Sequence, residues 1–212
     1  MSLVSYVGGS SGASAIGPAV VTTVDTTTTD GLKLCTADNT TDTITCAAHG
    51  WSNGDRVGFA GTTTYPTGLN GTTMYYVINA AANTFQVSLT SGGAAVNFTT
   101  NGASVCVGKI TTLFSIALST HDQYVLDFAL SCSTTGTLIR SGYWVQNISF
   151  RRTAGNISSS TRQGFVQQNG NNKFNVFTGI DIGTQTAIIG AYGSSVETTR
   201  WLGYITYIRI KS

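Results

Sequence analysis

Short runs of β-branched and aromatic residues dominate the hydrophobic pattern of this chain, and clusters of Gly, Asn, Asp and Thr separate them. Such runs between turn residues are typical of β-strands. No segment shows the i, i+3, i+4, i+7 spacing of apolar residues that an amphipathic helix requires. The pattern therefore predicts an all-β protein, organised in three successive regions.

The first region, residues 1–25, has the pattern of an N-terminal arm and a first strand. Residues 3–7 (LVSYV) are typical of a short strand, residues 8–14 (GGSSGAS) of a flexible linker, and residues 19–24 (AVVTTV) of a further strand. The run TTTTDG that follows predicts a turn or linker.

The second region, residues 26–108, predicts a small antiparallel β module. Its Asn-Gly pairs at positions 53, 70 and 101 predict type I′ turns, in which both central residues have φ > 0. The predicted strands are LKLC (32–35), TITCAA (43–48), RVGFAG (56–61), MYYVIN (74–79), TFQVSL (84–89), VNFTT (96–100) and SVCVG (104–108).

The third region, residues 109–212, has longer runs, of which 124–130 places its four large apolar residues on one face. The final run, WLGYITYIRI, is apolar on both faces. A strand of that kind is buried on both faces, which a chain of this size hardly achieves alone, so we expect packing against sister copies in a closed ring. The predicted interface residues are Trp144, Trp201, Tyr204 and Ile208.

Composition strengthens the expectation of an assembly. Charged residues make up 9% of the chain, against roughly 25% in ordinary globular proteins, and a surface so poor in charge repels its neighbours weakly. The net charge of +2 and the absence of a basic cluster beyond Arg151-Arg152 exclude a nucleic-acid footprint. No apolar run approaches the ~18 residues of a membrane span, so no membrane insertion is expected. The N-terminus lacks the pattern of a secretory signal, which predicts synthesis in a cytoplasm.

The four cysteines are Cys35, Cys46, Cys106 and Cys132. No pair has the spacing of a zinc site, so neither a metal nor another cofactor is expected. Buried thiols are the favoured state, because free cysteine behaves as a small hydrophobe. Cys35 and Cys46 flank a turn-like ADNTTD segment and would meet across a hairpin, although cytoplasmic synthesis argues against a disulfide there.

Residues 42–100 carry a specific series of motifs: DTIT-x-x-AHG, an NGD turn, a YYV strand, and NTFQVS followed by GGAAV. This series resembles a small β module of tailed-bacteriophage virion proteins. The segments YVGGSSGAS (6–14), YVLDFALSCSTTG (124–136), WVQNISFRRTAGN (144–156) and RWLGYITYIRI (200–210) resemble the jelly-roll domain of phage fibre ends and head proteins. The resemblances imply a jelly-roll-like β-sandwich at 109–212 that forms a trimer, with the module inserted in it or preceding it.

Candidate chemistry is sparse. His49 is expected to be a turn residue that binds backbone, and the neighbours His121 and Asp122 would point to opposite faces of a strand. We therefore expect no catalytic residues and no enzyme. Trp51, Tyr65 and Tyr75 would form an aromatic platform for sugar rings or a partner protein, unless some of them face the core of the module.

The resemblances imply a virion structural protein, made in the host cytoplasm, whose partners are its own copies and the major capsid protein or other virion proteins. Decoration or cementing of the capsid as a homotrimer is the favoured function, because the chain has no repeat shaft that would give reach. A tail or head fibre protein that attaches to a host surface glycan or protein is the alternative. A glycan-degrading spike enzyme is disfavoured because the chain has only 9 acidic residues.

Overall fold

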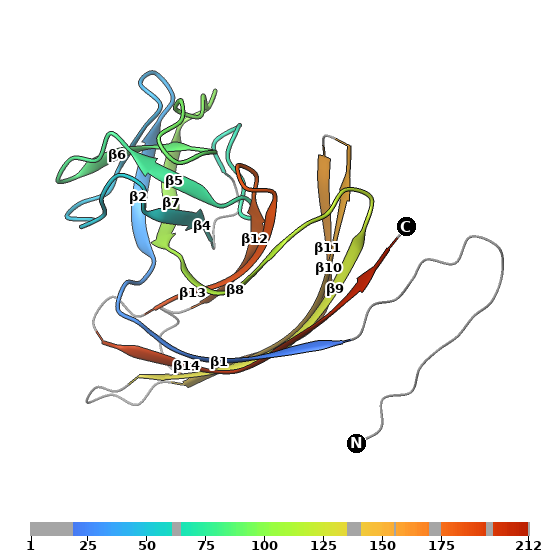
Figure 1. Ribbon diagram of the computed structural model, residues 1–212. Helices are drawn as coiled ribbons and strands as arrows, with labels where there is room; N and C mark the ends of the chain where they lie inside the picture. Colours follow the sequence, from blue (N-terminus) through green and yellow to red (C-terminus); the bar gives the residue numbers. More distant parts are fainter. Residues whose placement is uncertain are drawn as a thin grey trace.

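The chain folds into antiparallel β-sheets, and its all-β class is confirmed. The structure, a computed structural model, describes residues 19–60, 65–134, 141–154, 156–169, 175–193 and 197–211, which contain no helix. Figure 1 shows two parts, a curved sandwich of two sheets and a compact barrel that lies on the smaller sheet. The predicted arm segment at 3–14 lies outside the described residues.

The sandwich holds a five-stranded sheet in the order β1-β14-β9-β10-β11 and a three-stranded sheet in the order β12-β13-β8. Its first strand, β1, continues to Thr28, so the predicted boundary at residue 25 falls inside a strand. The strands are β1 (Val20–Thr28), β8 (Thr111–Ala117), β9 (Gln123–Thr134), β10 (Ser141–Thr153), β11 (Asn156–Asn169), β12 (Asn175–Asp181), β13 (Thr186–Tyr192) and β14 (Thr199–Ile210).

The strand order of the sandwich differs from that of a jelly roll. A jelly roll pairs its first strand with its last, its second with its second-last, and so on inward. The pairs β1–β14, β8–β13 and β10–β11 follow this rule, but β9 pairs with β10 and β12 pairs with β13 instead of with each other. The described strands therefore form an antiparallel sandwich with one Greek key, β14-β9-β10-β11, and the jelly-roll order is not confirmed.

The barrel is closed by strands in the order β2-β3-β6-β5-β4-β7. These strands lie between β1 and β8 in the chain, so the barrel is inserted into the sandwich. They are β2 (Lys33–Asp38), β3 (Thr43–Thr45), β4 (Arg56–Phe59), β5 (Tyr75–Ile78), β6 (Thr84–Ser88) and β7 (Gly102–Lys109).

One predicted barrel strand is absent, since residues 96–100 form a loop. Phe98 of this loop is fully buried in the barrel core, and its N–H donates to the carboxylate of Asp42 at 3.0 Å. The apolar residues of this run indicate burial. Val96 N–H still bonds to the carbonyl of Val87 in β6 at 2.8 Å, but the N–H of Phe98 binds a side chain instead of a strand.

The prediction of type I′ turns is wrong at all three Asn-Gly pairs. None of the three asparagines has a positive φ, and among their glycines only Gly54 has one, at 89°. The asparagine side chains instead accept backbone hydrogen bonds, two of them from a different hairpin. The acceptor–donor pairs are Asn53–Ala80 (2.9 Å), Asn70–Thr73 (2.8 Å) and Asn101–Asn39 (2.8 Å).

Cys35 and Cys46 form a disulfide across the β2–β3 hairpin. Both residues are buried in the barrel core. The preference for buried thiols is therefore wrong for this pair, because the hairpin brings residues that are 11 apart to neighbouring strand ends. A bridge of this kind typically stabilises a domain by about 2–4 kcal/mol.

Three hydrophobic clusters build the molecule: one inside the sandwich, one inside the barrel, and one between the barrel and the three-stranded sheet. The predicted common face of the run at 124–130 is confirmed, because its four large apolar residues all lie in the sandwich core. The third cluster consists of Met74, Tyr76, Ile110, Phe177, Ile188 and Tyr192. The strands β12 and β13 are therefore covered on both faces, whereas Ser115 and Ala117 of β8 remain exposed.

Tyr192 lies across the wall of the barrel. Gly58 on β4 and Gly108 on β7 are direct cross-strand partners, and their lack of side chains makes room for this ring. A Cβ atom at Gly58 would lie 2.2 Å from the Tyr192 hydroxyl, and one at Gly108 would lie 2.6 Å from its ring. The tyrosine is 1% exposed, and its hydroxyl has no hydrogen-bond partner.

Hydrogen bonds also join the barrel to the three-stranded sheet. The backbone of Ile180 on β12 accepts from Met74 N–H and donates to Thr72 carbonyl, each at 2.9 Å. Beside them, the hydroxyl of Tyr76 donates to the buried carboxylate of Asp181 at 2.6 Å. Burial, followed by the bond to Asp181, raises the pKa of Tyr76. The barrel and the sandwich thus share one continuous set of backbone and side-chain contacts.

We expect Gly58→Ala to lower the free energy of unfolding by about 1–3 kcal/mol through overpacking. The loss should shrink in the double variant with Tyr192→Phe, because that change removes the oxygen atom nearest to the new methyl group. Urea unfolding of the two single variants and the double variant gives the coupling energy. Strictly additive losses would show that the methyl group and the hydroxyl do not meet.

We expect Tyr192→Phe alone to leave stability near neutral pH unchanged or increased, because a buried hydroxyl without a partner costs about 1–3 kcal/mol. Burial raises the pKa of Tyr192. The unfolded chain ionises this tyrosine above about pH 10, whereas the folded chain keeps it protonated. Ionisation therefore favours the unfolded state, and the free energy of unfolding falls as the pH rises above about 10. Between about pH 8 and about pH 11, the free energy of unfolding should fall less in Tyr192→Phe than in wild type. An equal fall in both proteins would contradict a raised pKa of Tyr192.

Candidate functional site

Trp51, the strongest candidate for a ligand contact, is part of the barrel core. It is 4% exposed and packs edge-on against Phe85 at 5.3 Å between ring centroids. Its indole N–H donates to the carboxylate of Asp30, in the linker after β1, at 2.6 Å. A tryptophan in a turn thus has a structural role here, because its polar edge ties the barrel to the linker.

His49 is fixed beside it by two backbone contacts. The N–H of Trp51 donates to Nδ1 at 3.0 Å, and Nε2 lies 2.7 Å from the carbonyl oxygen of Ala81. Since Nδ1 accepts, the ring hydrogen belongs on Nε2. Lys33 covers the outside, donating to the carbonyls of Ala48 (3.1 Å) and His49 (2.9 Å). With both ring nitrogens engaged, the histidine is a residue of the β3–β4 loop that binds backbone, as expected for a turn residue.

The other two predicted platform residues lie apart from an open surface. Tyr75 is 1% exposed, packs edge-on against Phe59, and its hydroxyl accepts from Asn70 N–H at 3.1 Å; burial raises its pKa. Tyr65 is half-buried, also beside Phe59. The exposed aromatic platform is therefore wrong for Trp51 and Tyr75, because both rings fill the barrel. A shallow surface depression is lined by Trp51 and His49 themselves together with small polar and apolar residues at 50, 52–53 and 80–82.

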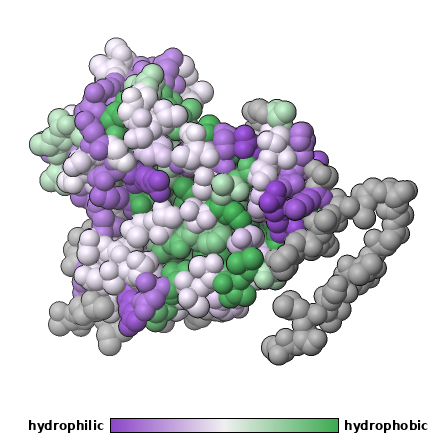
Figure 2. All heavy atoms as spheres, viewed as in Figure 1, coloured by the Kyte–Doolittle hydropathy of each residue, from purple (hydrophilic) through white to green (hydrophobic). Residues whose placement is uncertain are grey.

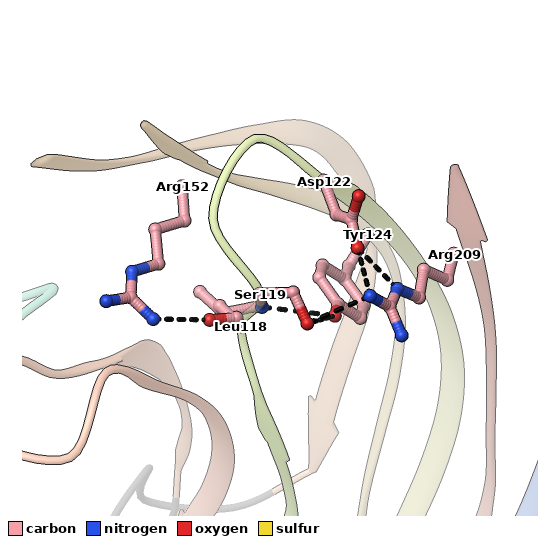
Figure 3. Close-up of polar contacts among 6 residues, drawn as sticks. All are labelled: Leu118, Ser119, Asp122, Tyr124, Arg152 and Arg209. Atoms are coloured by element: carbon pink, nitrogen blue, oxygen red, sulfur yellow. Dashed lines mark hydrogen bonds and ion pairs between the residues drawn. The ribbon is translucent and has the colours of Figure 1, made fainter. Parts of the chain in front are cut away.

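A polar cluster closes one end of the sandwich, where the β8–β9 loop meets the ends of β10 and β14 (Figure 3). Arg209 forms an ion pair with Asp122, which is 6% exposed, and also donates to Ser119 Oγ at 2.9 Å. The bond to Asp122 raises the pKa of Arg209. The Tyr124 hydroxyl bonds with Ser119, accepting from its N–H at 3.2 Å.

Arg152 reaches the same loop from the other side, donating to the carbonyl of Leu118 at 2.7 Å. His121 stands at the tip with a positive φ of 72° and its side chain exposed. It lies in a turn, so the predicted start of a strand there is wrong; β9 begins at Gln123. The arrangement clamps the loop and contains no nucleophile held by a base.

The aspartate side chains of the chain are bonded within the fold. Each of the eight aspartates accepts a hydrogen bond from another residue of the chain. The acceptor–donor pairs are Asp25–Arg200, Asp30–Trp51, Asp38–Thr40, Asp42–Phe98, Asp55–Ser52, Asp122–Arg209, Asp127–Asn147 and Asp181–Tyr76. Within the described ranges, no group of three His, Cys, Asp or Glu residues is placed to hold a metal ion.

The predicted interface residues separate into two sets. Trp201 is 0% exposed in the sandwich core, and its indole N–H donates to Thr28 at 3.0 Å; it is not available to a sister copy. The side chain of Trp144 lies outside the described residues. Tyr204 is 52% exposed and Ile208 half-buried, and both point away from the core.

These two residues belong to what we call the outer apolar face of the five-stranded sheet. Cross-strand partners share a face; Tyr204 lies opposite Thr23 and Ala129, so small neighbours leave its ring uncovered. Sequence reasoning missed two exposed members, Leu202 (39%) and Val21 (64%), although the two-sided pattern of the final run contained the signal for Leu202. The face comprises Val21, Val125, Ala129, Leu202, Tyr204 and Ile208.

Comparison with known proteins gives no match: no protein-family model, no curated protein and no solved structure is significantly similar to the chain. In the part of the chain that the structure describes, no helix has the length and apolar character needed to cross a membrane.

We expect Trp51→Ala to lower the free energy of unfolding by about 3–5 kcal/mol, the usual cost of deleting a buried tryptophan. Leu34→Ala is the matched control, because Leu34 lies on the same barrel but is 68% exposed; its effect should stay within about 0.5 kcal/mol. Denaturant unfolding measures both. Equal stability of Trp51→Ala and wild type would contradict the structural role of Trp51 and would favour a role in ligand binding.

Proposed function

We propose that the chain is a non-enzymatic structural protein of a tailed-phage virion, which decorates or cements the capsid surface as a homotrimer. The motif series at 42–100 and the segments at the chain ends support the virion setting through their resemblance to phage proteins. The major capsid protein or another virion protein is the proposed docking partner, and the virion the proposed location.

The observation that carries self-association is the outer apolar face. Val21 and Tyr204 are 64% and 52% exposed on neighbouring strands of a regular sheet, with Leu202 beside them at 39%. Large apolar side chains grouped on a surface mark interaction sites. Asp25 and Arg200 on this face pair with each other in two hydrogen bonds of 3.0 and 2.9 Å. Asp127, exposed on the same face opposite Thr206, accepts from the side-chain amide of Asn147 at 2.6 Å. Sister copies would bury this face at roughly 25 cal/mol per Å² of apolar surface.

The alternatives have less support. Attachment to a host glycan drew on exposed aromatic residues, and Trp51 and Tyr75 are buried. A glycan-degrading activity needs two acidic groups facing a substrate, whereas every aspartate is bonded within the chain. Copy number in purified virions, measured by quantitative mass spectrometry, separates decoration (hundreds of copies) from a fibre or tail protein (a few dozen or fewer).

We expect Tyr204→Asp to convert the proposed trimer into a monomer, because each interface would then bury an unpaired carboxylate. Light scattering coupled to size exclusion, at micromolar concentration, should give three times 22.2 kDa for wild type and one chain mass for the variant.

Leu34→Asp is the control for this experiment. It places the same charge at an apolar residue of the barrel that is 68% exposed and remote from the outer apolar face, so the trimer should persist. A monomeric wild type, or a Tyr204→Asp variant that keeps the wild-type mass, would contradict the proposed interface.

A further inference from the structure

The pair Asn70-Gly71 differs from the other two Asn-Gly pairs in how its asparagine side chain is bound. Three groups donate to Oδ1 of Asn70: the N–H of Thr72 at 3.0 Å, the hydroxyl of Thr72 at 3.1 Å and the N–H of Thr73 at 2.8 Å. Among the described residues, no acceptor binds the side-chain nitrogen of Asn70 or the N–H of Gly71. The oxygen of this amide is therefore held tightly, while its nitrogen and the next backbone nitrogen are free.

Asparagine is chemically labile, most of all before glycine, whose nitrogen can attack the side chain without hindrance from a Cβ atom. Hydroxide removes the proton of the glycine N–H, and the nitrogen forms a bond to Cγ, which places a negative charge on Oδ1. The bond from Cγ to Nδ2 then breaks, and ammonia leaves with a proton taken from water. A five-membered succinimide remains, and water opens it at either carbonyl carbon to give aspartate or isoaspartate.

The hydrogen bonds at Asn70 favour this attack. The three donors lie at the oxygen atom that becomes negatively charged, so their bonds strengthen as the charge develops. The attacking nitrogen of Gly71 has no bond to a described residue that must first be broken. Asn70 is exposed, and polar and neutral residues (purple and near-white) predominate over the barrel in Figure 2. Water and hydroxide therefore have access to the pair.

The other two pairs lack this combination. Asn53 and Asn101 each accept one hydrogen bond on Oδ1 from the described residues, at 2.9 and 2.8 Å. The N–H of Gly54 is bound to the carbonyl of Val77 at 2.8 Å, and Gly102 lies in β7 within the ladder to β2. The same dipeptide thus occurs in three environments of one chain, and two of them serve as internal controls.

The fold also favours keeping both residues of the labile pair. A Cβ atom at position 71 would lie 2.6 Å from the hydroxyl of Tyr65 and 3.2 Å from the carbonyl oxygen of Phe59, so a larger residue would have to displace its neighbours. At position 70, the side-chain oxygen binds two backbone N–H groups of the turn that follows, a role suited to asparagine and aspartate.

The pair lies directly before the residues that join the barrel to the sandwich. The carbonyl of Thr72 accepts from the N–H of Ile180, and the N–H of Met74 donates to the carbonyl of Ile180, each at 2.9 Å. Isoaspartate at position 70 would add a methylene group to the backbone of this loop and shift Thr72 relative to Ile180. Aspartate would keep both the ordinary backbone and an acceptor oxygen.

We propose that Asn70 is a site of spontaneous modification: in the folded chain it deamidates through the nitrogen of Gly71 faster than the other two Asn-Gly pairs. The isoaspartate product loosens the hydrogen bonds to Ile180. This inference is independent of the proposed virion function, because the reaction needs only the chain and water.

Peptide mapping by mass spectrometry, during incubation of the full-length folded chain at mildly alkaline pH, measures all three sites in one sample. We expect Asn70 to deamidate about tenfold faster than Asn53 or Asn101, or more. In the urea-unfolded chain, the reference, the three rates should be similar, because glycine follows each asparagine. Thr72→Val removes one donor from Oδ1 and keeps both backbone donors, so it should slow Asn70 by about threefold to tenfold and leave the other two sites unchanged.

The second part of the proposal is tested on the products. The isoaspartate form of the aged chain, separated by chromatography, should exchange the amide hydrogens of Met74 and Ile180 about tenfold faster than fresh wild type. Asn70→Asp is the matched control, because it carries the same charge without the longer backbone, and its exchange at these amides should stay near that of wild type.

Each outcome decides one part of the proposal. Deamidation of the folded chain that is no faster at Asn70 than at Asn53 and Asn101 would overturn it. An equal rate in Thr72→Val and wild type would overturn activation through Oδ1. Equal exchange in the isoaspartate form and in Asn70→Asp would overturn the effect on the hydrogen bonds to Ile180. Fast deamidation confined to Asn70, slowed in Thr72→Val and followed by faster exchange only in the isoaspartate form, supports both parts.

Discussion

The close approach of Tyr192 to the glycine pair of the barrel wall is the constraint on which the rest of the molecule depends. A tyrosine ring can lie there only because Gly58 and Gly108 face each other without side chains. This approach brings β13 against the barrel, so β12 and β13 are covered on both faces and form the middle layer of the molecule. A separate module connected by flexible linkers would need neither the glycine pair nor the buried bond between Tyr76 and Asp181.

The middle layer determines where apolar surface remains. Because β12 and β13 are covered on both faces, the three-stranded sheet keeps partly exposed apolar side chains only on β8 among its described strands, and the five-stranded sheet keeps them on its outer face. The few charged groups of the chain are also used within the fold, because its aspartates bind backbone, hydroxyl, amide, indole or arginine groups. The clamp made by Asp122 and Arg209 and the link from Asp30 to Trp51 are two such contacts.

Local patterns predicted the strands well, and contacts distant in sequence poorly. Alternation identified the buried face of the run at 124–130 and the two-sided character of the final strand, because both depend on the period of a strand alone. The role of Trp51 depends on Asp30 and the closed barrel, which no local spacing reveals. The Asn-Gly prediction failed for a related reason at two of the three pairs, because the side chains of Asn53 and Asn101 bind a different hairpin and these tertiary contacts overrode the intrinsic turn preference. The strand order of the sandwich likewise depends on which sheet β10 and β11 join.

The two exposed apolar regions differ in a way that relates to what each can bind. The outer apolar face presents side chains from a complete ladder, so a partner must bind through side-chain packing, as a second folded surface does. The edge of β8 presents backbone groups together with half-covered side chains, so it fits an extended segment that supplies hydrogen bonds and apolar contacts at once.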